Sequence, residues 1–177
     1  MDKATYNANK KWIDEITDNH KSAIFGSLKF YNTDKFHISE SDAEIWLSLL
    51  LNEIDKKTVG RDKNLKRIVF RHYGKAFSSE NRNLHYHILW LLDDGIYDVA
   101  PSIVLTAYDN ALTKMKEKEN TLKVKRGYGR AILDVKTSIA EVAIDVKASA
   151  HYGAGTRSAI TEGQVLEELL MAKYSHF

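Results

Sequence analysis

Two histidines in the apolar segment 84–92 have the spacing that points most directly to chemistry. His85 and His87 are separated only by Tyr86, in the run Leu-His-Tyr-His-Ile-Leu-Trp-Leu-Leu. Because side chains alternate across a β-strand, residues two apart project from the same face. Two neighbouring imidazoles are a suitable pair of ligands for one divalent ion. The alternative interpretation is that both are ordinary strand residues, hydrogen-bonded to backbone carbonyls and water.

A third ligand of a suitable type lies nearby in the sequence. The preceding apolar segment ends in Arg71-His72-Tyr73-Gly74, and the connection to the next segment contains Glu80. Either His72 or Glu80 would complete a three-ligand site that keeps positions open for water, as a catalytic ion requires. The sequence therefore predicts a metal centre formed by His85, His87 and one of these two residues.

Hydrophobic periodicity and capping signals indicate the elements that must position these residues. Helices are predicted in the first twenty residues, from Ser39 or Ser41 to before Gly60, over 100–118, over 138–151, and from 162 or 164 to 174. Strands are predicted over 22–30, 65–73 and 84–92, with a strand or hairpin over 122–135 that is broken at Gly127-Tyr128-Gly129. The short connection between the second and third strands favours an antiparallel pair.

These elements predict a single α+β domain over residues 1–177. We expect a small, mainly antiparallel sheet with helices packed on one side of it. The core of the domain is expected over about 22–152, followed by a C-terminal helix over about 162–175.

Composition excludes several classes of protein. The chain has 177 residues, of which 44% are hydrophobic and 28% charged, the balance of one globular domain. It has no cysteine, which excludes disulfides, thiolate metal sites and a cysteine nucleophile. No apolar run approaches the roughly 18 to 20 residues of a membrane span, and the N-terminal residues do not form a secretory signal. A cytoplasmic protein with no membrane partner is expected.

The charge is nearly balanced, with 26 Lys and Arg against 24 Asp and Glu. A global positive field therefore gives no argument for nucleic-acid binding. One segment, 114–130, is locally basic, and it is either a phosphate-contacting face or a solvated hairpin or helix end. The candidate DNA-binding residues in it are Lys123, Lys125, Arg126 and Arg130.

Several of these segments together resemble a known family. The segment Phe25-Gly26-Ser27-Leu28-Lys29-Phe30, the helix after it, a strand that ends near Arg71-His72, and His85-Tyr86-His87-Ile88-Leu89 resemble the first two motifs of HUH-type replication initiators and relaxases. These proteins act in rolling-circle replication of phages, plasmids and small single-stranded DNA viruses. The resemblance covers about residues 22–152. It implies a five-stranded central sheet and a bound Mg²⁺ or Mn²⁺. The partners that it implies are single-stranded DNA or an origin hairpin, and a host replication helicase or polymerase.

The resemblance also implies a tyrosine nucleophile on a later helix. That tyrosine attacks a DNA phosphate held on the metal and leaves a 5′-phosphotyrosine link and a free 3′-OH. The family commonly has a tyrosine three residues before a lysine; here Lys147 is present, but Ile144 stands in the tyrosine's position. The remaining candidates, in order of preference, are Tyr152, Tyr108 and Tyr174.

The expected placement of the helices favours Tyr152. The apolar residues of 100–118 need the core on the Tyr86 and Trp90 face of the third strand, so Tyr108 is expected to be buried away from the ion. The alanine-rich segment 138–151 is expected to cross the face of the two histidines and to end beside Tyr152.

The function expected from the resemblance is metal-dependent nicking and joining of single-stranded DNA, with Lys147 near the scissile phosphate. Because the helix-internal tyrosine is missing, a non-catalytic nucleic-acid-binding or regulatory protein on the same frame is the alternative. A third hypothesis is a structural or interaction protein that binds no metal.

Overall fold

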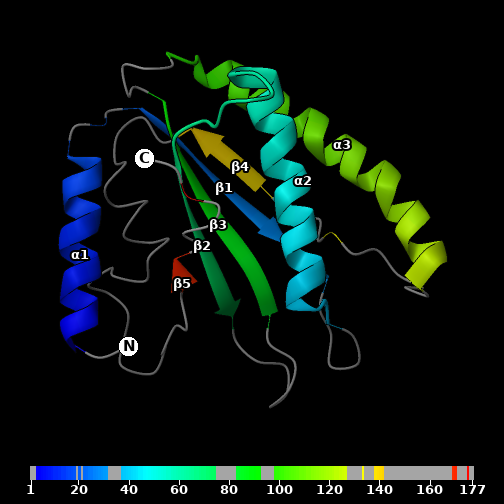
Figure 1. The fold of residues 1–177 in the computed structure, drawn as a ribbon, viewed down its shortest axis with the longest axis horizontal. Coiled ribbons are helices and arrows are strands. Elements are labelled where there is room, and N and C mark those ends of the chain that lie inside the picture. The colour runs from blue at the N-terminus through cyan, green and yellow to red at the C-terminus, as the bar shows by residue number, and fades with distance from the viewer. Residues whose placement is uncertain are drawn as a thin grey trace.

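The computed structural model describes residues 3–18, 20, 22–31, 37–74, 83–92, 98–126, 133, 138–141, 169–170 and 175. The elements in this part of the chain are, in order, α1 (Lys3–Thr17), β1 (Ala23–Lys29), α2 (Glu40–Thr58), β2 (Arg67–Gly74), β3 (Asn83–Leu91), α3 (Pro101–Arg126), β4 (Ser138–Glu141) and β5 (Leu169–Leu170). Figure 1 shows their arrangement around one sheet.

Within the described residues, five strands form this sheet in the order β4-β1-β3-β2-β5, and every neighbouring pair is antiparallel. Because β1 and β2 are both antiparallel to β3, they run parallel to each other, with β3 inserted between them. The run β1-α2-β2-β3-α3-β4 is therefore a split β-α-β arrangement of the ferredoxin-like kind. The predicted α+β class and the antiparallel pairing of the second and third long strands are confirmed.

Helices α2 and α3 cover one face of the sheet. Tyr86, Ile88 and Trp90 project from β3 into the larger core cluster, together with buried residues of both helices. On α3 the buried residues recur at the spacing of one helix face, namely Val104, Ala107, Tyr108, Ala111 and Met115. The predicted packing of this helix on the Tyr86 and Trp90 face is confirmed.

Helix α1 lies on the opposite face of the sheet (Figure 1). Its Ile13 is fully buried against a second, smaller cluster, with Trp12 and Ile16 partly buried beside it. The strand residues of this cluster are Ala23, Phe25, Ile68, Phe70, Leu89 and Leu91. The expectation that helices pack on one side of the sheet only is wrong. The strand residues of this smaller cluster make part of the second face apolar, and α1 covers that part.

Helix α2 begins and ends at recognisable signals. Of the two predicted caps, Ser39 is the one used: its Oγ accepts a hydrogen bond from the Asp42 backbone N–H at 3.1 Å. The helix ends at Thr58, before Gly60, as predicted. Gly60 has φ +103°, a conformation that glycine adopts without strain, and its N–H donates to the Asp55 carbonyl.

A buried ion pair joins the end of α2 to the start of β2. Arg67 Nη1 lies 2.7 Å from both carboxylate oxygens of Asp55, and the two side chains are only 3% and 5% exposed. The Leu65 backbone N–H also donates to Asp55 Oδ1, at 2.9 Å. Since a buried charge is tolerated when it is paired and hydrogen-bonded, this arrangement fixes where β2 begins relative to α2.

Three predictions for the second half of the chain need correction. Helix α3 continues to Arg126, so the predicted strand or hairpin over 122–135 is wrong at 122–126. Residues 138–141 form β4 rather than the start of a helix over 138–151. Residues 169–170 form β5, where the helix over 162–175 was predicted.

The last two differences arise because β1 and β2 each pair with β3 along one edge and have a second edge that needs a partner strand. Strand β4 pairs with β1 and β5 pairs with β2, which satisfies backbone groups that would otherwise be unpaired at the sheet edge. Ser175 contributes further, because its Oγ accepts a hydrogen bond from the Val69 N–H of β2 at 3.0 Å. Sheet pairing thus overrides the local helix preference of alanine-rich and leucine-rich segments.

The described helices do not include one that is both long and apolar enough to span a bilayer.

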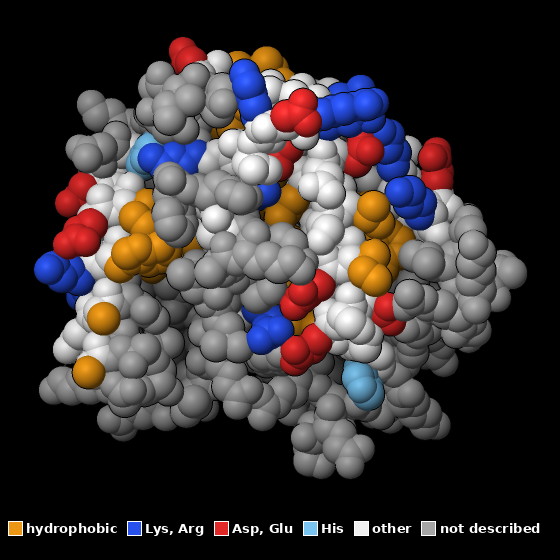
Figure 2. Space-filling view, viewed as in Figure 1, with side chains coloured by type: hydrophobic (Ala, Val, Ile, Leu, Met, Phe, Trp, Pro, Cys, Tyr) orange, Lys and Arg blue, Asp and Glu red, His pale blue; other side chains and the backbone are white. Residues whose placement is uncertain are grey.

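On the face shown in Figure 2, the Lys and Arg side chains are interspersed with Asp and Glu. An ion pair joins α2 and α3, where Lys114 Nζ of α3 contacts the carboxylate of Glu53 of α2. The hydrogen bond from Lys114 lowers the pKa of the Glu53 carboxyl.

Candidate metal centre

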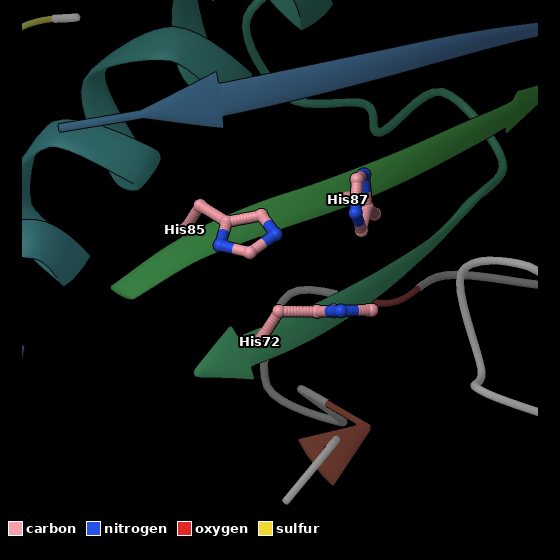
Figure 3. Close-up of side chains that lie close together, drawn as sticks. All are labelled: His72, His85 and His87. Carbon is pink, nitrogen blue, oxygen red and sulfur yellow. The ribbon is translucent and has the colours of Figure 1, made fainter. Parts of the chain in front are cut away.

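His72, His85 and His87 lie together on one face of the sheet (Figure 3). His85 and His87 alternate with Tyr86 along β3, and His72 of β2 is the direct cross-strand partner of His85. Register and alternation therefore place all three imidazoles on the same side. We call this side of the sheet the histidine face; it is the face on which α1 also lies.

The three rings are close enough to share one ion. Their ring centroids are 5.2 Å apart for His72 and His85, 4.3 Å for His72 and His87, and 5.0 Å for His85 and His87. One nitrogen of each ring can be chosen so that all three lie within 4.8 Å of one another. Nitrogens that bind one zinc-like ion at about 2.1 Å lie at most about 4.2 Å apart. Small rotations of the rings would therefore bring the three nitrogens within coordination distance of one ion.

Burial keeps His87 in the form that binds metals. His72 and His87 are buried, at 5% and 4% exposure, whereas His85 is half-buried. Burial lowers the pKa of His87 to about 2, and the neighbouring His72, His85 and Lys29 act in the same direction. The ring is thus neutral near neutral pH, and neutral imidazole is the ligating species.

Strand β1 positions the His87 ring. Ser27 is the direct cross-strand partner of His87, and its Oγ lies 3.0 Å from Nδ1 of that ring. Phe25, two residues earlier on the same face, stacks on His87 with a centroid distance of 5.1 Å and an interplanar angle of 28°. Because Nδ1 contacts Ser27, His87 would coordinate an ion through Nε2.

Sequence reasoning did not identify Ser27 or Phe25 as parts of this site. The signal was present, because a strand over 22–30 with Ile24, Leu28 and Phe30 in the main core must turn Phe25 and Ser27 to the other face. What the sequence lacked was the register that places β1 beside β3.

Tyr108 does not belong to this site. It is 1% exposed on the opposite face of the sheet, packs edge-on against Trp90 at 6.3 Å between ring centroids, and donates a hydrogen bond from its hydroxyl to the Ser27 carbonyl at 3.1 Å. Burial and, to a smaller degree, Asp109 raise the pKa of this phenol. The expectation that Tyr108 is buried on the Trp90 face of the sheet, opposite the histidines, is confirmed, and this placement disfavours it as a nucleophile.

The other predicted site residues are placed only in part. Of the two candidates for third ligand, His72 joins the cluster, while Glu80 lies outside the described residues. Tyr152, Lys147, Tyr174 and Arg130 also lie outside them. Lys123, Lys125 and Arg126 belong to the last turns of α3, so their backbone is helical rather than part of a hairpin.

The fold and the cluster define an α+β protein with a candidate three-histidine metal centre on its sheet. No family model, curated protein or solved structure matches the chain.

Proposed function

We propose that this protein is a metal-dependent enzyme that nicks and joins single-stranded DNA through a phosphotyrosine link, in rolling-circle replication or mobilisation of a phage, plasmid or virus. The observation that carries the proposal is the cluster of His72, His85 and His87 on two paired strands. The resemblance of the segments around Ser27 and His85 to the motifs of HUH-type enzymes connects such a centre to DNA phosphates.

The donor set favours a transition ion. Mg²⁺ prefers oxygen ligands, whereas imidazole binds the divalent transition metals well. The cluster within the described residues consists of three imidazoles and includes no carboxylate. Of the two ions that the resemblance implies, Mn²⁺ therefore fits these residues better than Mg²⁺.

The residues of the chain have distinct parts in the proposed reaction. A bound ion would polarise a phosphodiester and stabilise the charge that develops on it. His72, His85 and His87 would hold the ion, and Ser27 and Phe25 keep the His87 ring in its orientation. Tyr152 is the first candidate nucleophile and Tyr174 the second, with Lys147 near the scissile phosphate.

A trapping experiment tests the proposal without knowledge of the DNA sequence that is recognised. The full chain is incubated with single-stranded oligonucleotides of randomised sequence and Mn²⁺, and DNA that stays attached to denatured protein is recovered and sequenced. We expect a covalent adduct that requires Mn²⁺, is prevented by a chelator, and is lost in the His85→Ala/His87→Ala variant. Ser102→Ala, which removes an exposed hydroxyl from α3 on the other face, serves as the matched control.

Two results would overturn this function. The first is an adduct formed without metal or by the double variant. The second is salt-sensitive binding of single strands without any adduct in the presence of Mn²⁺, which would identify a non-catalytic nucleic-acid-binding protein.

A further inference from the structure

We propose that Lys29 forms, next to the three histidines, an anion subsite that binds a phosphodiester group of the substrate. This inference rests on the proposed function, because the anion would bind where the ion is bound. It gives the site a substrate-contacting residue on β1, a strand that carries none of the three ligands.

The strand register places Lys29 beside the cluster. Lys29 is the direct cross-strand partner of His85, just as Ser27 is the partner of His87. Directly opposed residues of an antiparallel pair have Cβ atoms about 4.5–5.5 Å apart and project from the same face. The side chain of Lys29 is half-buried and long enough to reach past His85 toward an ion held by the three rings.

Lys29 lies at the end of β1 that is farther from the apolar contacts with α1. The apolar residues that pack with α1, such as Ala23, Leu89 and Leu91, lie at the other end of β1 and β3. Along the strands, the histidine face thus changes from apolar residues that pack with α1 to a polar end that contains Lys29, His85 and His72. His87 lies at the boundary, beside Phe25 and Phe70.

An ion held by the three imidazoles and the ammonium group of Lys29 would together favour an anionic ligand. Three neutral imidazoles leave the charge of a divalent ion uncompensated, and Lys29 adds a further positive charge close enough to affect His87. The three candidate ligands are imidazoles, so none of them contributes a negative charge to the ion. A cation beside a bound metal ion is unfavourable unless an anion bridges the two, and a phosphate oxygen is such a bridge.

Lysine suits this task because its ammonium group is a compact point charge with three donors. One oxygen of a phosphodiester can bind the ion while the second accepts a hydrogen bond from Lys29. The same contact would neutralise charge that develops on the phosphoryl oxygens during attack.

The test separates binding of the ion from binding of the anion. Mn²⁺ uptake is measured by electron paramagnetic resonance, and binding of the dinucleotide thymidylyl-thymidine to the Mn²⁺-loaded protein by broadening of its ³¹P resonance. Four proteins are compared: wild type, Lys29→Met, Lys29→Arg, and Lys116→Met, which removes an exposed lysine from α3.

We expect Lys29→Met to bind Mn²⁺ at least as tightly as wild type and to bind the dinucleotide at least tenfold more weakly. Lys29→Arg should restore dinucleotide binding to within about threefold, since it keeps the charge, and Lys116→Met should match wild type. Unchanged dinucleotide binding by Mn²⁺-loaded Lys29→Met would overturn the anion subsite at Lys29 and would leave the proposed function standing. Failure of the wild type to bind Mn²⁺ would overturn the proposed function, and the subsite with it.

Discussion

Ser27 contacts His87 and Tyr108 at once, on opposite faces of the sheet. Its hydroxyl lies 3.0 Å from Nδ1 of His87, and its carbonyl accepts the hydrogen bond of the Tyr108 hydroxyl at 3.1 Å. One residue of β1 thereby connects a candidate metal ligand with the core beneath α3. The orientation of the His87 ring thus depends on the position of β1 in the sheet as well as on β3, the strand that carries His87.

We expect Ser27→Ala to weaken Mn²⁺ binding about tenfold, because loss of a hydrogen bond to a ligating histidine typically reduces metal affinity by about 10- to 100-fold. The change leaves the hydrogen bond of the Ser27 carbonyl in place, so the fold should be retained. Calorimetric titration with Mn²⁺ measures the effect, with Ser102→Ala as the control. Equal affinity of wild type and Ser27→Ala would show that the contact does not orient the ring for metal binding.

The metal-free protein should lose stability in acid partly through His87. The native ring stays neutral down to a pKa of about 2, whereas the unfolded chain takes up a proton near pH 6.5. Between these values the unfolded state binds more protons, so this contribution is complete above about pH 6.5 and is lost as the pH falls. From about pH 7 to about pH 5 the expected loss is about 2 kcal/mol.

Urea unfolding of wild type and His87→Gln at both pH values, in the presence of a chelator, measures this loss. The free energy of unfolding of His87→Gln should fall less with acid than that of wild type. An identical pH dependence in the two proteins would contradict the assigned neutral state of His87.

Loss of the carboxylate from the buried ion pair should be strongly destabilising. Asp55→Ala leaves Arg67 charged and buried without its partner, at an expected cost of about 3–5 kcal/mol. Glu53→Ala breaks the more exposed pair with Lys114 and should cost no more than about 1 kcal/mol. Chemical denaturation of the two variants compares the costs directly, and equal values would mean that the Arg67 side chain finds other partners.

The covalent adduct should depend on Tyr152. In the trapping experiment, Tyr152→Phe should lose the adduct, whereas Tyr108→Phe and Tyr174→Phe should keep it. For Tyr108 the expectation has a structural basis, since its hydroxyl is bonded to the Ser27 carbonyl on the far face of the sheet. Mass spectrometry of the modified peptide identifies the attacked residue, and an adduct that persists in Tyr152→Phe would exclude Tyr152 as nucleophile.

The elements that the sequence predicted well are those with strong local signals. The stripe of Ala43, Trp46, Leu50 and Ile54 and the serine cap define α2, and alternation within 84–92 places His85 and His87 on one face. His72 remained one of two alternatives, because only the pairing of β2 with β3 brings it opposite His85.

Elements that depend on distant pairing were predicted least well. The segment Ser138–Glu141 lies in an alanine-rich, helix-prone stretch and becomes a strand because β1 offers an unpaired edge. The contribution of Ser27 and Lys29 to the site depends on β1 lying beside β3, sixty residues away along the chain for Ser27 and His87. Such register is set by tertiary contacts, and a short sequence window does not contain it.

The pairing of β2 with β3 also has a consequence for protein design. All three candidate ligands lie on these two consecutive antiparallel strands, and their relative positions follow from the pairing of His72 with His85 and of Phe70 with His87. A transplanted hairpin with this register would carry all three candidate ligands into another twisted antiparallel sheet. A neighbouring strand of the recipient would supply a hydroxyl opposite His87, as Ser27 does, and an ammonium group opposite His85, as Lys29 does. A recipient that lacks one of these two groups would show what that group contributes. Metal binding by the three histidines could thus be measured outside this chain, with each supporting side chain added separately.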